Sequence, residues 1–263
     1  MVRLSANISM LFQELEFWDR FEAAATAGFG AIEMLFPYAY APDKIAQALK
    51  AHNLQVSVFN LAPGDWSAGM RGLAVDPAHR DAFRKSVVQG LEYAEVLQAP
   101  HVHVMAGIAA PDEQNRKCYI ENIIYAADRF SAAGRRVLIE PINARSMPGY
   151  FLNSTDQALQ LLADINHPAV GLQFDIFHHQ MSRGDVFNSL QAAFPKTRHI
   201  QIAGVPERHE PNFGELNIHA VLDHLDALGY KGWVGCEYRP RTTTQEGLHW
   251  MQRYIELNTG QAD

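Results

Sequence analysis

The sequence lacks the features that mark several large classes of protein. Its 263 residues include only two cysteines, Cys118 and Cys236, which are far apart and outside any Cys-x-x-Cys or Cys/His spacing. This excludes a readable disulfide framework or structural zinc site. No apolar run reaches the ~18 residues of a membrane span. Ser5, Asn7 and Ser9 interrupt the N-terminal apolar segment, which is therefore a poor signal sequence. We expect a cytoplasmic protein without a membrane partner.

An excess of positive charge is also missing. The chain has 22 Lys and Arg against 29 Asp and Glu, a formal net charge of −7. A protein that binds nucleic acid normally carries a basic face, so no nucleic-acid partner is expected. Hydrophobic residues make up 48% of the chain and charged residues 19%. That composition is typical of an ordinary folded protein and excludes disorder.

Short β-rich runs alternate along the chain with segments of helical period. The eight runs are 4–8, 31–36, 55–61, 101–105, 137–142, 170–176, 199–203 and 233–238. The helices expected between and after them are 14–27, 42–52, 78–98, 112–133, 154–165, 185–194, 217–228 and 243–258. Eight β-α units in about 260 residues predict a single α/β domain over 1–263, a (β/α)8 TIM barrel. The alternative, a doubly wound sheet, would more often show a Gly-rich phosphate loop after the first strand, and none follows 4–8.

Four polar residues share the inward phase near the ends of consecutive strands. They are Glu140, Asp175, Gln201 and Glu237, separated by 35, 26 and 36 residues. Three carboxylates in one cavity repel each other by several kcal/mol at an effective dielectric of ~20, unless a cation or proton neutralises them. Carboxylate and amide oxygens favour Mg²⁺ or Mn²⁺ over Zn²⁺. We therefore predict a divalent metal held by these four residues. Any one of them alone could be an ordinary hydrogen-bonded residue at a strand end.

Further side chains are candidates for binding a substrate. His178, three residues after Asp175, could orient the carboxylates or contact the substrate, and His103 shares the inward phase of its strand. Arg71 and Arg208 lie in loops after the third and seventh strands, where they could clamp a carboxylate. The competing interpretations are a loop histidine, a core histidine and solvated surface arginines.

Several motifs together resemble the hydroxypyruvate isomerase family within the xylose-isomerase-like TIM barrels. They are IEPIN at 139–143, QFDIFH at 173–178, HIQIA at 199–203, GWVGCEY at 232–238, SANISMLF at 5–12, APGDW at 62–66 and RTTT at 241–244. The resemblance therefore covers nearly the whole chain. Many related sugar epimerases and isomerases have His where this chain has Gln201, a departure that fits a harder ion than zinc.

The resemblance implies aldose–ketose isomerisation of a small 2-keto acid. In that reaction two glutamates, here Glu140 and Glu237, move a proton between adjacent carbons of a metal-stabilised enediolate. Asp175 and Gln201 would complete the metal site. IEPIN is most similar to hydroxypyruvate isomerase itself, which gives hydroxypyruvate as the first substrate expected and 2-hydroxy-3-oxopropanoate as its product. The segments 102–107 and 201–211 are closer to the 2-oxo-tetronate isomerase branch, which remains the alternative.

Three other functions stay open at this point. A ketose 3-epimerase would use the same two carboxylates, and a non-catalytic sugar-acid binding protein would need no opposed pair of glutamates. An apurinic endonuclease on the same barrel would need more metal-binding histidines and a basic face, against which the net charge of −7 argues. A homo-oligomer is possible, although no residue pattern marks an interface.

Overall fold

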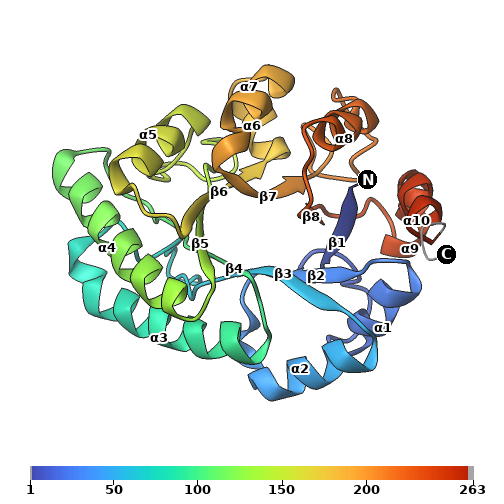
Figure 1. Cartoon of the computed structure of the whole chain (residues 1–263), viewed down its shortest axis with the longest axis horizontal. Coiled ribbons are helices and arrows are strands. Elements are labelled where there is room, and N and C mark those ends of the chain that lie inside the picture. The colour runs from blue at the N-terminus through green and yellow to red at the C-terminus, as the bar shows by residue number, and fades with distance from the viewer. Residues whose placement is uncertain (1, 260–263) are drawn as a thin grey trace.

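A computed structural model describes residues 2–259, in which eight parallel strands form a closed ring inside a layer of helices (Figure 1). The strands are β1 (Arg3–Asn7), β2 (Ala31–Met34), β3 (Gln55–Asn60), β4 (His101–His103), β5 (Arg136–Ile139), β6 (Val170–Asp175), β7 (Thr197–Ile202) and β8 (Trp233–Cys236). Each strand pairs with the next, and β8 closes on β1. The TIM barrel expected from the alternating pattern is confirmed. Residues 1 and 260–263 of the expected domain lie outside the described residues.

Helices cover the outside of the ring. The α-helices are α1 (Asp19–Thr26), α2 (Pro42–Ala51), α3 (Arg80–Val96), α4 (Glu113–Ala132), α5 (Thr155–Ile165), α6 (Ile176–Ser182), α7 (Val186–Ala193), α8 (Ile218–Ala227), α9 (Thr244–Gly247) and α10 (Gln252–Thr259). Short 3-10 turns are η1 (Pro37–Ala39), η2 (Pro77–His79), η3 (Phe194–Lys196) and η4 (Leu248–Met251). Among the described residues, none of these helices combines the length and hydropathy that a bilayer crossing requires.

Two expected helices differ from the observed ones, and one observed helix was not expected. The helix expected at 14–27 begins at Asp19, because residues 13–18 form turns and a bend and the Phe17 ring stacks on Tyr40, with centroids 3.9 Å apart. The helix expected at 243–258 is divided into α9, η4 and α10. An additional helix, α6, starts immediately after β6, where the Asp175 side chain accepts a hydrogen bond from the Phe177 backbone N–H. A carboxylate in this position caps a helix, so the same residue ends a strand and starts a helix.

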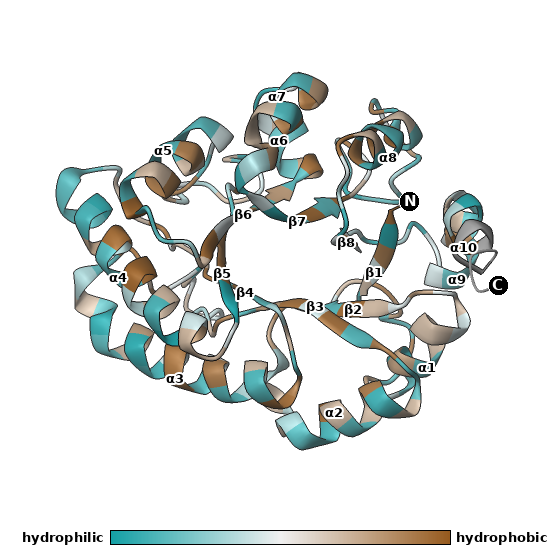
Figure 2. Ribbon diagram, in the orientation of Figure 1, coloured by the Kyte–Doolittle hydropathy of each residue, from teal (hydrophilic) through white to brown (hydrophobic). Residues whose placement is uncertain are grey.

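The apolar core lies between the strands and the helices. In Figure 2 brown hydrophobic segments of the strands alternate with teal polar ones, and the long helices carry brown on one side and teal on the opposite side. In α2, for example, Ile45 and Leu49 are buried one turn apart, which is the spacing of a helix that packs one face on a sheet. The strands of a parallel barrel are covered on the outside by helices. Apolar packing therefore occupies the outer face of the strands, and polar side chains of the strands point into the barrel interior.

Strand register places the site residues next to each other. Asp175 is the Cα partner of Gln201 across β6 and β7, and Gln201 is the partner of Gly235 across β7 and β8. Glu140 and Glu237 each follow the last residue of their strand directly. Because parallel strands end at the same rim of a barrel, these side chains share one mouth.

Candidate active site

The four residues predicted as a cluster are all buried at this mouth. Glu140 and Glu237 come from the ends of β5 and β8. Asp175 is the last residue of β6, and Gln201 is the last but one of β7. Four different strands thus each supply one polar side chain to the same end of the barrel.

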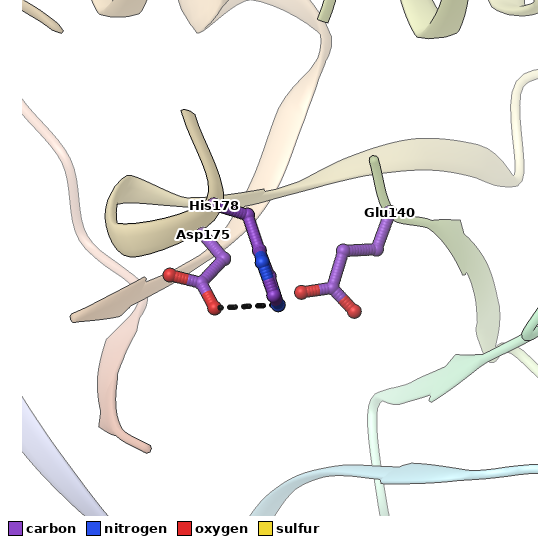
Figure 3. A group of neighbouring side chains, drawn as sticks. All are labelled: Glu140, Asp175 and His178. Atoms are coloured by element: carbon purple, nitrogen blue, oxygen red, sulfur yellow. Dashed lines mark ion pairs between the residues drawn. The ribbon is translucent and has the colours of Figure 1, made fainter. Parts of the chain in front are cut away.

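Glu140 and Asp175 meet a histidine at the centre of this mouth. One ligand atom from each of Glu140, Asp175 and His178 lies within 4.8 Å of the other two, and all three side chains are buried. Figure 3 shows the Glu140 carboxylate reaching from β5 toward Asp175 and His178, which approach from the opposite side. His178 Nε2 is 3.6 Å from Asp175 Oδ2. His178 thus lies beside two of the predicted carboxylates, and its role in binding stays a prediction.

Asn143 fixes which nitrogen of His178 carries the proton. The Ser146 backbone N–H donates to Asn143 Oδ1 at 2.8 Å, so the amide nitrogen of Asn143 must face the histidine. That nitrogen lies 2.6 Å from His178 Nδ1. Because Nδ1 accepts, Nε2 carries the proton and points at Asp175 as a donor. A protonated nitrogen cannot bind a cation, so this arrangement favours His178 as a hydrogen-bond donor rather than a metal ligand. Asn143 was part of a quoted motif, but no role was predicted for it.

His103 is oriented in a similar way by a residue that the sequence analysis missed. Its Nδ1 lies 3.2 Å from Asn60 Oδ1 and 3.5 Å from Glu140 Oε2, and both of these oxygens are acceptors. Nδ1 therefore carries the proton, and Nε2 is left as an acceptor with no hydrogen-bond partner among residues 2–259. Glu140 Oε1 is a second buried atom without a partner in this part of the chain. Asn60 ends β3, so its inward phase and strand-end position were the signal that could have identified it.

The two predicted arginines occupy different surroundings. Arg208 is half-buried beside the carboxylates, with Nη2 3.3 Å from Asp175 Oδ2 and 3.2 Å from Glu237 Oε1. Arg71 lines the cavity from the loop after β3. Its Nη1 donates to the carbonyls of Trp66 and Met70, and its guanidinium lies 3.9 Å from the centre of the Trp66 ring. Arg208 is thus bonded to the acidic cluster, whereas Arg71 is bonded to its own loop.

Burial and mutual repulsion make the acidic groups hard to ionise. Burial, followed by the charges of Glu237 and Asp175, raises the pKa of Glu140 well above its usual value. Burial also raises the pKa of Glu237 to about 8, although the Arg208 guanidinium opposes the change. The pKa of Asp175 is raised as well, again mainly by burial. The pKa of Arg208 rises because the carboxylates of Glu237, Asp175 and Glu140 outweigh the effect of its own burial.

These observations fit a divalent cation at the acidic cluster. Glu140 Oε1 is a buried oxygen without a partner among the described residues, and the surrounding carboxylates carry more negative charge than Arg208 alone neutralises. Oxygen-rich sites of this kind suit hard ions such as Mg²⁺ and Mn²⁺. Glu140 and Asp175 are the carboxylates best placed to hold such an ion, and Glu237 reaches the same space through its shared contact with Arg208.

Gln201 connects the mouth to a second polar layer, deeper in the barrel, that the sequence analysis did not anticipate. Its amide nitrogen donates to Glu33 Oε2 at 2.8 Å, and its amide oxygen accepts from Gln173 at 2.7 Å. Glu33 lies on β2 and is 1% exposed. A glutamate in the otherwise apolar run 31–36 was the available signal, and it pointed inward like the predicted residues.

A cavity of about 1140 Å³ opens above the acidic cluster. His103, Glu140, His178 and Glu237 form its polar floor, together with Arg208. Phe36 and Trp66 lie at its edge, with ring centroids 5.4 Å apart. The cavity gives a small polar ligand direct access to the buried carboxylates.

The xylose isomerase-like TIM barrel family matches residues 21–254 of the chain. The chain belongs to this family. A 2-oxo-tetronate isomerase from Cupriavidus necator is 47% identical over 97% of this chain and 99% of its own length. The hydroxypyruvate isomerase of Escherichia coli is 39% identical over 97% of this chain and 100% of its own. A crystal structure from Brucella melitensis, named AP endonuclease, family 2, superposes with a TM-score of 0.95 at 44% identity, covering 97% and 99% of the two chains. The resemblance inferred from the motifs is thus confirmed, and the xylose isomerase-like barrel described here is that of an isomerase.

Proposed function

We propose that this xylose isomerase-like barrel isomerises a small 2-keto acid by moving a proton between its carbonyl carbon and the neighbouring hydroxyl-bearing carbon. The observation that carries the proposal is the pair of buried glutamates, Glu140 and Glu237, which line one cavity together with Arg208. Arg208 in turn contacts Asp175. A raised pKa suits a carboxylate that must both take and return a proton near neutral pH. The relatives named as isomerases of hydroxypyruvate and of 2-oxo-tetronate support the same chemistry.

Each side chain has a proposed part in this reaction. One of Glu140 and Glu237 removes the proton from carbon, and the other delivers it to the adjacent carbon. Glu140, Asp175, Gln201 and Glu237 would hold Mg²⁺ or Mn²⁺. When bound, such an ion stabilises negative charge that develops on the substrate oxygens.

The remaining polar side chains are proposed to bind and orient the substrate. His178 donates from Nε2, and His103 offers the Nε2 acceptor to a substrate hydroxyl. Arg208, which already lies beside the acidic cluster, is the stronger candidate for binding the substrate carboxylate. Arg71 could assist once it leaves its backbone partners.

Two substrates fit this proposal, and the similarity to known relatives changes which of them should be tested first. The IEPIN motif favoured hydroxypyruvate. The 47% identity with the Cupriavidus necator protein instead makes 2-oxo-tetronate the first substrate to test, with hydroxypyruvate second. The two acids differ by one hydroxymethylene carbon. A cytoplasmic setting and a homo-oligomeric state remain predictions.

Nuclease activity has weaker support, despite the name of the Brucella melitensis structure. A net charge of −7 opposes binding to a DNA backbone. Within residues 2–259, the acidic and histidine side chains form one group close enough to hold a single ion, in which Glu140 and Asp175 supply the oxygens and His178 lies beside them as a donor. An epimerase would share the glutamate pair, so only analysis of the product separates it from an isomerase.

The deciding experiment follows 2-oxo-tetronate, hydroxypyruvate and a free ketohexose by proton NMR in D₂O, with Mg²⁺ or with a chelator. We expect Mg²⁺-dependent conversion of 2-oxo-tetronate to its 3-oxo isomer or of hydroxypyruvate to its aldehyde isomer. Inversion at one carbon of the ketohexose, without conversion of either acid, would indicate an epimerase. No conversion of any substrate and no deuterium uptake would leave the non-catalytic binding protein.

A further inference from the structure

The deeper polar layer contains a carboxylate that contacts only donors. Glu33 Oε1 accepts from His199 Nε2 at 2.5 Å and from Ser57 Oγ at 3.4 Å. Glu33 Oε2 accepts from Gln201 Nε2 at 2.8 Å and from Asn7 Nδ2 at 3.4 Å. Neither Glu33 oxygen therefore lacks a donor, and the carboxylate has one well-defined orientation in the barrel interior.

The neighbouring strand β8 leaves space for the Glu33 side chain. Gly235 on β8 has no side chain, and a Cβ atom there would lie 2.0 Å from Glu33 Oε1. Gly235 is also the register partner of Gln201. The backbone of β8 thus leaves room for a buried carboxylate directly beneath a proposed metal ligand.

From this geometry we infer that Glu33 is a positioning residue, which fixes the orientation of the Gln201 amide and so presents its oxygen to the cation. A carboxylate only accepts hydrogen bonds, so the Gln201 nitrogen must face Glu33. The Gln201 oxygen is then directed away from Glu33, on the strand position beside Asp175. One lone pair of this oxygen accepts from Gln173 Nε2, which leaves the second lone pair for a cation. The negative charge of Glu33 also polarises the amide and makes its oxygen a better ligand. This inference rests on the proposed function, because it assumes that Gln201 is a ligand.

The nitrogen and the oxygen of the Gln201 side-chain amide contact different partners. Gln173 Nε2 donates to Gln201 Oε1 at 2.7 Å, which agrees with the orientation that Glu33 imposes. If an amide replaced the Glu33 carboxylate, either of its ends could face Gln201. Gln201 could then turn its NH₂ group toward the cavity, where it would repel a cation.

The test measures Mn²⁺ affinity of the full chain by electron paramagnetic resonance of the free ion. We expect Glu33→Gln to weaken Mn²⁺ binding about 10–100-fold, the usual effect of removing a partner that orients a ligand. Ser57→Ala is the matched control. It removes a hydrogen bond to the same carboxylate without touching Gln201, and its affinity should stay close to that of the unchanged protein.

Exchanging the carboxylate and the amide between positions 33 and 201 distinguishes a lost orientation of the residue 201 side chain from general damage to the fold. Gln201→Glu alone sets two carboxylates against each other and should bind Mn²⁺ poorly. The double variant Glu33→Gln, Gln201→Glu restores a donor facing an acceptor and again directs an oxygen at the cation. We expect it to bind Mn²⁺ at least about tenfold more tightly than Gln201→Glu, the scale of an orienting partner.

The outcomes distinguish this inference from the proposed function. If the unchanged protein binds no Mn²⁺, the ligand set fails and the role of Glu33 fails with it. If the unchanged protein binds Mn²⁺ and a folded Glu33→Gln variant binds it equally well, only the role of Glu33 is overturned. Should Glu33→Gln not fold, equal affinity of Gln201→Glu and the double variant would overturn it instead.

Discussion

Two buried polar layers lie on top of each other inside this barrel, and they differ in how completely their carboxylates are paired. In the deeper layer both oxygens of Glu33 accept hydrogen bonds from donors on neighbouring strands. In the upper layer Glu140 Oε1 and His103 Nε2 have no partner within residues 2–259. Burying a polar atom without a partner costs free energy. The upper layer therefore retains atoms that a ligand can satisfy, whereas the deeper layer provides a fixed support.

The largest expected effect comes from removing a base in the upper layer. Glu140→Gln and Glu237→Gln keep the shape of each side chain but cannot take a proton. We expect each variant to lower turnover at least ~10²-fold, the lower end of a general-base contribution. Turnover of 2-oxo-tetronate and hydroxypyruvate in the presence of Mg²⁺ is the measurement.

Glu207→Gln is the matched control, because Glu207 is exposed in the loop after β7. It should leave turnover nearly unchanged. Near-normal turnover in both the Glu140 and the Glu237 variants would remove these two residues from the proton transfer.

The pH dependence of stability tests the electrostatic difference between the layers. The pKa of Glu237 is raised to about 8 by burial and by its acidic neighbours, from an ordinary value of 4.5. Below pH 8 the folded protein therefore holds a proton that the unfolded chain has released. Stability then falls as pH rises toward 8. The buried histidines of the mouth, His103 and His178, do not offset this trend, because burial lowers their pKa and keeps them neutral in the folded protein.

We expect the chelator-treated protein to melt at a lower temperature at pH 8.5 than at pH 7. Mn²⁺ should raise the melting temperature at both pH values and reduce the difference between them, since the ion replaces the bound proton. Glu237→Gln should flatten the curve of the metal-free protein. A melting temperature of the metal-free protein that is constant or rises from pH 7 to pH 8.5 would contradict the raised pKa.

The upper layer was largely predictable from the sequence, and the deeper layer was not. Glu140, Asp175 and Glu237 sit at the ends of strands whose alternation is clear, and parallel strands bring their ends to one mouth. Glu33 lies in the middle of the barrel, and its partners His199 and Gln201 are more than 160 residues away in the chain. Contacts between residues so far apart in the chain depend on the register between strands. The alternation of apolar and polar residues along each strand does not specify that register. The short helix α6 was missed for a similar reason, because Asp175 was interpreted only as a ligand and not as a cap.

The smallest expected effect concerns the glycine that makes room for Glu33. In Gly235→Ala the new Cβ would lie 2.0 Å from a carboxylate oxygen that its hydrogen bonds prevent from moving freely. We expect a loss of about 1–3 kcal/mol in the free energy of unfolding, as for other overpacked interiors. The melting temperature should fall by about 2–4 °C for each kcal/mol. Mn²⁺ affinity should fall as well, because the displaced carboxylate no longer orients Gln201.

Gly171→Ala provides the comparison on β6. Its new Cβ would also be crowded, at 2.3 Å from Arg198 Cγ, but this clash involves Arg198 instead of Glu33. We therefore expect a comparable loss of stability and unchanged Mn²⁺ affinity. Equal losses of stability in the two variants, together with equal Mn²⁺ affinities, would mean that the deeper layer fills space without supporting the site above it. A selective loss of Mn²⁺ affinity in Gly235→Ala would instead show that the deeper layer determines the geometry of the upper layer.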